Sequence, residues 1–368
     1  MGNIEFLLSD LLNRLDVHFM ASPTTTEKTV MLGSRHAPEF ACLPFKINVG
    51  NFIQCLEKGA DTLIMAGGRG PCRFGYYAEV ERRILQDAGY DFEMVVIEPP
   101  AMGVKKFLGP IKRISGKSTR KIWRAFKETF PKARLFDELE KTTLAERCYE
   151  LEPGSTTKAY KRAKEIVAQV VTPGQLEDAR REAFAVLDAV PKDRTRDVLR
   201  IGIVGEFFIL LEPFVNFDVE EWLGARGVSV HRSVYVTDWI GPSTQNPTGG
   251  ISDAEIAVLA KPYLGHFVGG EGLASVGHTI AYAKDGLDGV IHMFPFTCMP
   301  ETIAKAILPR VSRDHNIPVI HFTIDEQTGK AGVVTRLEAF IDLLRSRKRR
   351  KAGLAISAKA GIQSFLSF

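Results

Sequence analysis

Short apolar runs alternate with longer amphipathic stretches over the first third of the chain. DTLIMA at 61–66 and FEMVVIEP at 92–99 are typical of buried strands, and KTVMLG at 28–33 is predicted to be a third strand. The stretches 47–59 and 74–89 space their apolar residues as helices do, and each ends in a glycine, which commonly closes a helix. Strands and helices in alternation predict a parallel sheet.

The pattern changes twice further along the chain. From about residue 116 to 194 the strand signal disappears, and charged-apolar patterns predict helices with breaks near Pro153-Gly154 and Pro173-Gly174. A second alternating series begins at Val198. Its predicted strands are 199–206, 228–234, 288–296 and 317–325, and its predicted helices are 216–225, 252–264, 272–285, 300–314 and 335–346.

These patterns predict an α/β protein with two doubly wound parallel-sheet domains that face a central cleft, joined by a helical connecting segment. We place the N-terminal α/β domain at 1–115, the helical segment at 116–197, the C-terminal α/β domain at 198–345 and a basic tail at 346–368. A chain of 368 residues is long enough for each α/β domain to bury its own core.

Composition indicates where the protein works. Hydrophobic residues make up 45% of the chain and charged residues 25%, and no apolar run approaches the roughly 20 residues that cross a bilayer. The first residues, MGNIEFLLSDLLNRLD, are amphipathic and carry acids, without a basic start or a small-residue cleavage site, so no signal peptide is predicted. We therefore expect a cytoplasmic protein with no membrane span.

The positive net charge depends on one short run, RSRKRRK. Removing its six charges takes the net charge from +4 to −2. Such a run is typical of a solvated helix end, and we expect no nucleic-acid partner. The residues concerned are Arg345, Arg347, Lys348, Arg349, Arg350 and Lys351.

Five cysteines are too few and too scattered for a disulfide framework, so each is expected to be a packing, metal-binding or catalytic residue. Cys42, Cys72 and Cys298 each follow a strand or extended loop and precede a predicted helix, which places them at helix amino termini. Cys55 and Cys148 lie inside helical patterns, so we interpret them as packing residues.

The placement of the first three cysteines has a chemical consequence. Helix amino termini favour negative charge, which lowers the pKa of a thiol and suits an anionic sulfide cluster. In open α/β sheets these loops lie at the carboxyl edge of the strands, so three thiolates from two facing domains would converge on one cleft. Their long separations match no compact zinc or ferredoxin spacing, so packing as small hydrophobes remains an alternative.

Longer stretches around these cysteines resemble a known superfamily. They are GADTLIMAGGRGPCRFGYY, CLPFK and DGVIHMFPFTCMPETIAKAILPRVSRDHNIPVIHFTIDEQTGKAGVVTRLEAFIDLL. They look like the cluster-bearing subunits of the 2-hydroxyacyl-CoA dehydratase and benzoyl-CoA reductase superfamily, and more closely like its acyl-CoA dehydratase activase-related branch, often called CoA protein activases. The similarity covers most of residues 20 to 345, and its most specific pieces are GPCRFG, CMPE, IDEQTG and TRLEAF.

The resemblance implies two α/β domains with a helical part, and a [4Fe–4S] cluster held by three cysteines, here Cys42, Cys72 and Cys298. It also implies that an ATP-hydrolysing activase delivers a low-potential electron to the cluster. In the dehydratases of anaerobic metabolism this electron yields a ketyl radical that loses the 2- or 3-hydroxyl group of a CoA thioester.

Several functions remain open under this resemblance. The chain would be a 2-hydroxyacyl-CoA dehydratase-like lyase or an acyl-CoA reductase subunit, or else a non-catalytic electron-transfer or cluster-carrying protein. A metal-free α/β binding module is the alternative from a different class. The partners implied are an activase of the actin and sugar-kinase type or a fused-activase relative, a homologous second subunit or a second copy of the chain, and an acyl-CoA.

Two arginines flank the Cys72 turn. Arg69 and Arg73 would lower the net charge of a cluster, or hold a phosphate or carboxylate of an acyl-CoA. The alternative is a salt bridge to Glu79 or Glu81 nearby.

Acids and histidines elsewhere are weaker candidates. Glu206 and Glu271 follow extended stretches, where acids bind ligands or exchange protons. Glu301 is expected to complement the dipole of its own helix. We assign no function to His292 and His321, which lie within predicted strands.

The sequence contains no P-loop. SGKS at 115–118 is the nearest match, but Ile111 stands where the earlier glycine is required. The chain also shows no ATPase segment of the kind found in the fused relatives.

Overall fold

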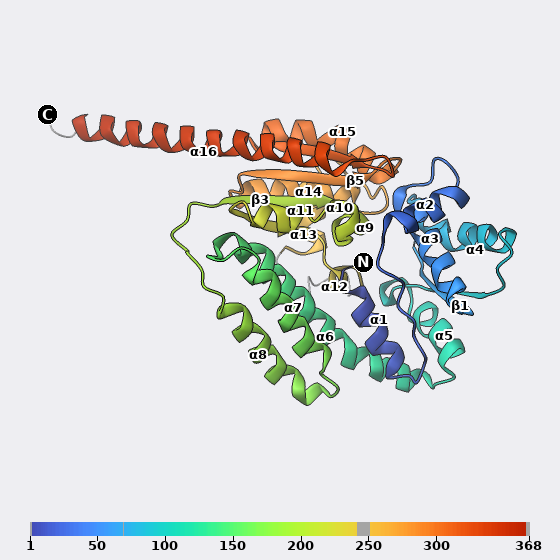
Figure 1. The fold of residues 1–368 in the computed structure, drawn as a ribbon. Coiled ribbons are helices and arrows are strands. Elements are labelled where there is room, and N and C mark those ends of the chain that lie inside the picture. The colour runs from blue at the N-terminus through green and yellow to red at the C-terminus, as the bar shows by residue number, and fades with distance from the viewer. Residues whose placement is uncertain (1, 69, 241–250, 366–368) are drawn as a thin grey trace.

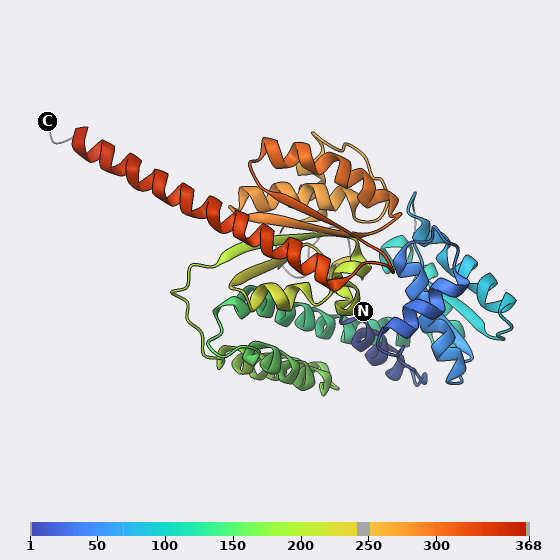
Figure 2. The ribbon, with the colours of Figure 1, turned by 45° about the horizontal axis from the view of Figure 1, so that its top comes forward.

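The computed structural model of the chain describes residues 2–68, 70–240 and 251–365 (Figure 1). The protein is of mixed α/β class with parallel sheets. In both views the green helices α6 (Thr119–Glu146), α7 (Ser155–Ala168) and α8 (Leu176–Asp188) lie on one side of the larger sheet, and the blue N-terminal elements lie at one end of it (Figures 1 and 2).

Two predicted strands form the smaller sheet. β1 (Thr62–Ala66) and β2 (Glu93–Ile97) pair in parallel over their full lengths. The surrounding helices are α3 (Leu43–Glu57), α4 (Tyr77–Asp87) and α5 (Val104–Ser115). The glycines predicted to close α3 and α4 both have left-handed φ, which a residue with a side chain rarely adopts.

The prediction of a strand at 28–33 is wrong, because this run lies within a helix, α2 (Glu27–His36). Thr26 caps the helix: its side chain accepts from the N–H of Thr29, and the Thr29 hydroxyl accepts from the N–H of Thr26. Gly33 lies so close to α3 that a Cβ atom there would stand 1.6 Å from a carbonyl oxygen of α3. This capping box and close helix contact outweigh the strand-like composition.

The residues from 119 to 188 are mainly helical, as the charged-apolar patterns predict. α6, α7 and α8 are separated at the two Pro-Gly breaks that the sequence indicates, and α1 (Ile4–Asn13) packs against α6. The core of the segment is formed by Leu135, Phe136, Leu139, Ala163, Val167, Ala183 and Leu187, with smaller contributions from their neighbours.

The four strands predicted in the second half form one parallel sheet. They are β3 (Leu199–Gly205), β4 (Val228–Arg232), β5 (Gly289–Pro295) and β6 (Val319–Ile324), in the order β4-β3-β5-β6. Every residue of β5 is buried, as expected for a central parallel strand.

Helices cover both faces of this sheet. One face packs against α9 to α11 and α16, and the other against α14 and α15. The bounds are α9 (Phe207–Leu211), α10 (Pro213–Asn216), α11 (Val219–Gly224), α12 (Val236–Ile240), α13 (Asp253–Ala260), α14 (Gly272–Lys284), α15 (Met299–Asp314) and α16 (Lys330–Phe365).

Helix α3 also packs on the second sheet. Leu43 and Ile47 belong to the same buried cluster as Phe322 of β6. Lys46, between them, is 5% exposed and donates from Nζ to Glu326 Oε1 at 2.5 Å. The CLPFK and IDEQTG stretches, far apart in the sequence, are therefore in direct contact.

The basic run belongs to α16, which projects beyond the rest of the protein (Figures 1 and 2). Arg345 donates to the carbonyl oxygen of Arg226, and Lys348 pairs with Asp197. The expectation of a solvated helix end therefore holds for part of the run. The exposed members are Arg345, Arg349, Arg350 and Lys351. Within the described part of the chain, none of the helices has the length and apolarity that crossing a membrane requires.

Candidate functional site

Three of the five cysteines occupy the same kind of position. Cys42 is the N-cap residue of α3, Cys72 that of the 3-10 helix η1 (Arg73–Tyr76), and Cys298 that of α15. Proline follows in the first turn of α3 and of α15. The predicted placement at helix amino termini is confirmed for all three.

One arginine joins the chain segments of these cysteines. Arg73, the first residue of η1, donates from Nη1 to the carbonyl oxygen of Phe40 at 3.3 Å and from Nη2 to that of Thr297 at 2.6 Å. Phe40 lies two residues before Cys42, and Thr297 directly precedes Cys298. A single guanidinium therefore brings all three cysteine-bearing loops together.

The alternative for Arg73, a salt bridge to Glu79 or Glu81, is not what the described residues show. Glu79 pairs with Arg82 on the same helix face. Glu81 is fully buried in α4. Arg69, the other arginine of this turn, lies outside the described residues, so its proposed role remains a prediction.

A pair of glycines separates Cys72 from the first turn of α15. A Cβ atom on Gly269 would stand 2.6 Å from the backbone nitrogen of Cys72. A Cβ atom on Gly270 would stand 3.4 Å from the side chain of Pro300 and 3.9 Å from Cys72 Sγ. Both glycines have φ in the left-handed region, +88° and +44°, so the chain can pass here only without side chains.

Cys42 has a polar partner inside the protein. Its Sγ is hydrogen-bonded to the hydroxyl of Tyr77, which is buried in the core around the smaller sheet. The Tyr77 ring lies edge-on against Phe45 and Phe74, with ring centroids 4.9 Å and 5.3 Å away. Tyr76 beside it is 73% exposed, so only Tyr77 of the two neighbouring tyrosines faces the core.

Burial dominates the electrostatics of the three thiols. It raises the pKa of Cys42 to about 11, and it raises the pKa of Cys72 and of Cys298 as well. The prediction that helix termini lower these pKa values is therefore wrong for the free thiols. Because a bound metal centre takes cysteine as the thiolate, a cationic centre would offset this penalty and release protons on binding.

Two predicted acids lie beside the cysteines. Glu206 caps α9, and its carboxylate accepts from the N–H groups of Phe208 and Ile209 at 3.1 Å and 3.0 Å. Burial raises its pKa to about 7 and that of Glu271 to about 8. The charges of both acids raise the pKa of Cys72, and Glu271 directly follows the two glycines that lie against Cys72.

Sequence reasoning assigned Glu301 only a helix-dipole role, and it did not indicate that this acid contacts a histidine pair. Glu301 is fully buried, where its carboxylate accepts from Ser275 Oγ at 2.9 Å and lies 2.7 Å from His292 Nε2. His292 Nδ1 lies 2.9 Å from His321 Nδ1. His292 and His321 are register partners on β5 and β6. The sequence signal for this pair was a histidine at the corresponding place in each of two apolar strand patterns.

The donors at this site are three cysteine thiols, a ligand type of both zinc and iron–sulfur centres. A single zinc ion needs its ligands within about 2.3 Å of one point, and the described residues contain no group of three or more His, Cys, Asp or Glu that could hold an ion. A [4Fe–4S] cluster takes its thiolates on different irons, so its ligands are spaced by the cube. Cys42, Cys72 and Cys298 are the three thiols that such a cluster would take.

The other two cysteines are packing residues, as interpreted from the sequence. Cys55 is 7% exposed in the core around α3. Cys148 is 1% exposed, and its Sγ donates to the carbonyl oxygen of Ala145 at 3.3 Å.

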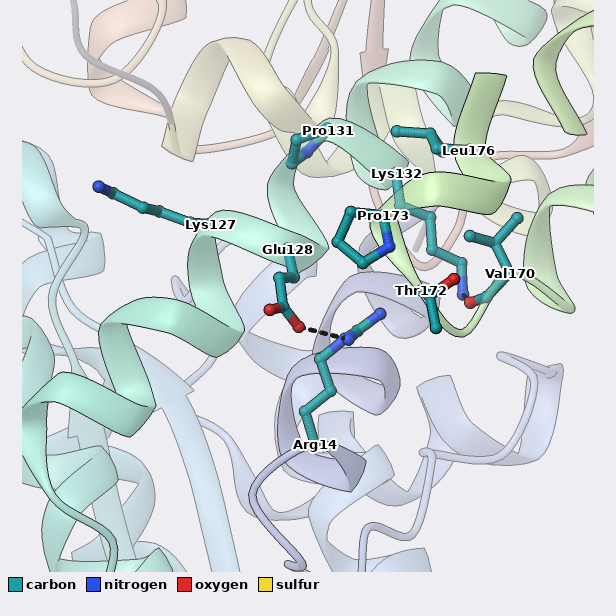
Figure 3. Close-up of a pocket in the computed structure, with 9 residues that line it drawn as sticks. All are labelled: Arg14, Lys127, Glu128, Pro131, Lys132, Val170, Thr172, Pro173 and Leu176. Carbon is teal, nitrogen blue, oxygen red and sulfur yellow. Dashed lines mark hydrogen bonds and ion pairs between the residues drawn. The ribbon is translucent and has the colours of Figure 1, made fainter. Parts of the chain in front are cut away.

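A small pocket of about 40 Å³ lies in the helical segment, away from the cysteine-bearing loops (Figure 3). Three of its charged residues have ion-pair partners, since Arg14 contacts Glu128 at 2.8 Å and buried Lys132 contacts Asp10, which is not a lining residue, at 2.9 Å. It is far smaller than cofactor sites, which occupy roughly 300 Å³ or more. Its lining is Arg14, Lys127, Glu128, Pro131, Lys132, Val170, Thr172, Pro173 and Leu176.

No protein-family model matches this chain, and no curated protein is significantly similar to it. Functional inference therefore depends on the motifs of the chain and on the site that they form.

Proposed function

We propose that the protein is a cytoplasmic iron–sulfur protein similar to the 2-hydroxyacyl-CoA dehydratase subunits. Cys42, Cys72 and Cys298 would hold a [4Fe–4S] cluster that receives a low-potential electron from an ATP-dependent activase. The observation that carries this proposal is the double hydrogen bond of Arg73, which gathers the loops of all three cysteines. When bound, the cluster would supply single electrons for dehydration or reduction of a CoA thioester.

The surrounding residues have separate tasks in this proposal. Arg73 would offset negative charge at the site as well as hold the loops. Gly269 and Gly270 let the backbone pass directly against Cys72. Tyr77 orients the Cys42 sulfur through its hydroxyl.

We also propose that substrate binds in a cleft between two doubly wound domains. Cys42 and Cys72 come from elements around the first sheet, whereas Cys298 follows β5 of the second sheet. The loops of Cys72 and Cys298 follow β1 and β5 at their carboxyl ends, where α/β proteins bind ligands, whereas the loop of Cys42 joins α2 to α3.

A non-catalytic electron-transfer or cluster-carrying protein is the second candidate, and a specific observation favours it. Four aromatic side chains close to the cysteines are more than half exposed: Phe40 67%, Tyr76 73%, Phe267 51% and Phe296 54%. Exposed apolar groups gathered around one site are typical of surfaces that bind another protein.

One experiment separates these two functions. The protein is reconstituted anaerobically with iron and sulfide, reduced with titanium(III) citrate, and titrated with a non-hydrolysable acyl-CoA while its electron paramagnetic resonance spectrum is recorded. A catalyst should show a saturable change in the cluster spectrum. A spectrum unchanged at millimolar acyl-CoA would contradict the catalytic proposal and support the electron carrier.

A further inference from the structure

A continuous chain of hydrogen bonds starts in the first turn of α15. Glu301 Oε2 accepts from Ser275 Oγ at 2.9 Å and lies 2.7 Å from His292 Nε2. His292 Nδ1 lies 2.9 Å from His321 Nδ1. Glu301 and His292 are fully buried, whereas His321 is partly exposed. The chain therefore connects the surface at β6 with the interior near Cys298.

The hydrogen bonds among Glu301, His292 and His321 can all form with the protons in either of two arrangements. With Glu301 ionised, His292 donates from Nε2 to the carboxylate and accepts at Nδ1 from the Nδ1–H of His321. With Glu301 protonated, the carboxyl group donates to His292 Nε2, and the Nδ1–H of His292 donates to His321. Either way, every hydrogen bond between these three side chains is satisfied.

The change from the first arrangement to the second is balanced as the uptake of one proton. One proton enters at Nε2 of His321, and the Nδ1 proton of His321 moves to His292 Nδ1. The Nε2 proton of His292 then moves to Glu301 Oε2. No bond between heavier atoms changes and no electron is transferred within the chain.

Burial and nearby positive charges keep the imidazoles of His292 and His321 neutral. Burial lowers the pKa of His292 to about 3 and that of His321 to about 4, and Lys305 acts in the same direction on both. Arg336 adds to the effect on His321. Burial raises the pKa of Glu301 to about 8. The other titratable groups whose charges interact with Glu301 are Cys298, Glu206 and Glu271.

We propose that His321, His292 and Glu301 form a proton path from solvent at β6 to the interior beside Cys298. Its purpose rests on the proposed function, because electron arrival adds negative charge near buried carboxyl groups and loss of a hydroxyl group as water consumes a proton. Glu301 Oε1 is buried and has no hydrogen-bond partner among the described residues. Rotation of the protonated carboxyl group, which exchanges its two oxygens, would carry the proton to the side on which Oε1 lies.

The first test needs no cluster. The metal-free protein is labelled with ¹⁵N-histidine, and the ring nitrogen shifts are followed by NMR from pH 5 to pH 10. The rings of His292 and His321 should exchange tautomers together in one transition, and Glu301→Gln should abolish that transition at both rings. His278, a partly buried histidine that takes no part in these hydrogen bonds, serves as the internal control. Separate transitions, or a joint transition that persists in Glu301→Gln, would overturn the path.

Ser275→Ala provides a second variant if Glu301→Gln does not fold. It removes a donor to the Glu301 carboxylate, so the joint transition should move to higher pH, and an unmoved transition would contradict the path. In the reconstituted protein, the reduction potential should fall with rising pH and lose that dependence in Glu301→Gln; a pH-independent potential in the unmodified protein would overturn the coupling. A protein that binds no cluster but shows the joint transition would refute the proposed function alone.

Discussion

Arg73 donates a hydrogen bond of 2.6 Å to the carbonyl oxygen of Thr297, 224 residues further along the chain. The same guanidinium donates to Phe40, so it holds loops that the sequence separates widely. Lysine carries the charge of arginine, but its single nitrogen cannot reproduce this two-pronged geometry.

Arg73→Lys should therefore behave like Arg73→Ala. We expect each to lower the free energy of unfolding by about 1 kcal/mol, measured with urea, and to reduce the iron retained after reconstitution. Arg82→Ala is the matched control, because Arg82 makes an exposed pair on α4 and should change stability by less than about 0.5 kcal/mol. Full retention of iron and stability in Arg73→Lys would show that charge alone matters at this position.

The glycine at position 269 should tolerate no side chain. Gly269→Ala would place Cβ against the backbone of Cys72, so we expect a loss of about 2 kcal/mol or more in unfolding free energy together with loss of iron binding. Gly59→Ala is the control, since its φ of +91° is also left-handed but nothing lies within 4 Å of the added Cβ. It should cost about 1 kcal/mol and leave the iron content unchanged. Similar iron loss in both variants would refute the steric explanation.

Removing Glu326 should destabilise the protein more than removing its partner Lys46. Lys46 is 5% exposed and Glu326 27%, so removing the acid leaves a buried ammonium group without its partner. We expect Glu326→Gln to cost about 2 to 4 kcal/mol and Lys46→Met about 1 kcal/mol, both measured by urea unfolding. Equal costs would mean that Lys46 is hydrated in solution.

Buried Glu81 predicts a pH dependence of stability. Burial raises its pKa from 4.5 to about 8, so the folded state holds a proton that the unfolded state releases. The contribution of this proton to the free energy of unfolding is therefore fully present below pH 4.5 and is lost as the pH rises towards 8. Glu81→Gln should remove this decline, so the variant should gain stability relative to the unmodified protein between pH 5 and pH 9. Parallel stability curves across that range would contradict this assignment.

Much of the fold could be predicted from apolar periodicity. All six strands of the described residues were indicated by runs such as those at 61–66 and 317–325, because parallel strands are buried on both faces and read as continuous apolar stretches. The strand predicted at 28–33 is a helix because a cap at Thr26 and contact with α3 set its conformation. Apolar periodicity contains no information on either feature.

The site was predictable only in part. Local context placed Cys42, Cys72 and Cys298 at helix amino termini, since a helix start is a local property of the sequence. The carbonyl partners of Arg73 and the link between His292 and His321 depend on which loops and strands meet in space. Burial also reversed the expected pKa shift of the thiols, because helix termini favour a thiolate by less than desolvation opposes it.

The central claim is that three particular cysteines hold an iron–sulfur cluster, and iron and sulfide analysis after anaerobic reconstitution tests it most directly. We predict about four iron and four sulfide per chain in the unmodified protein and in Cys148→Ala, and loss of both with the visible absorption in Cys42→Ala, Cys72→Ala and Cys298→Ala. Metal-free protein after full reconstitution, or equal iron content in Cys72→Ala and Cys148→Ala, would contradict the account.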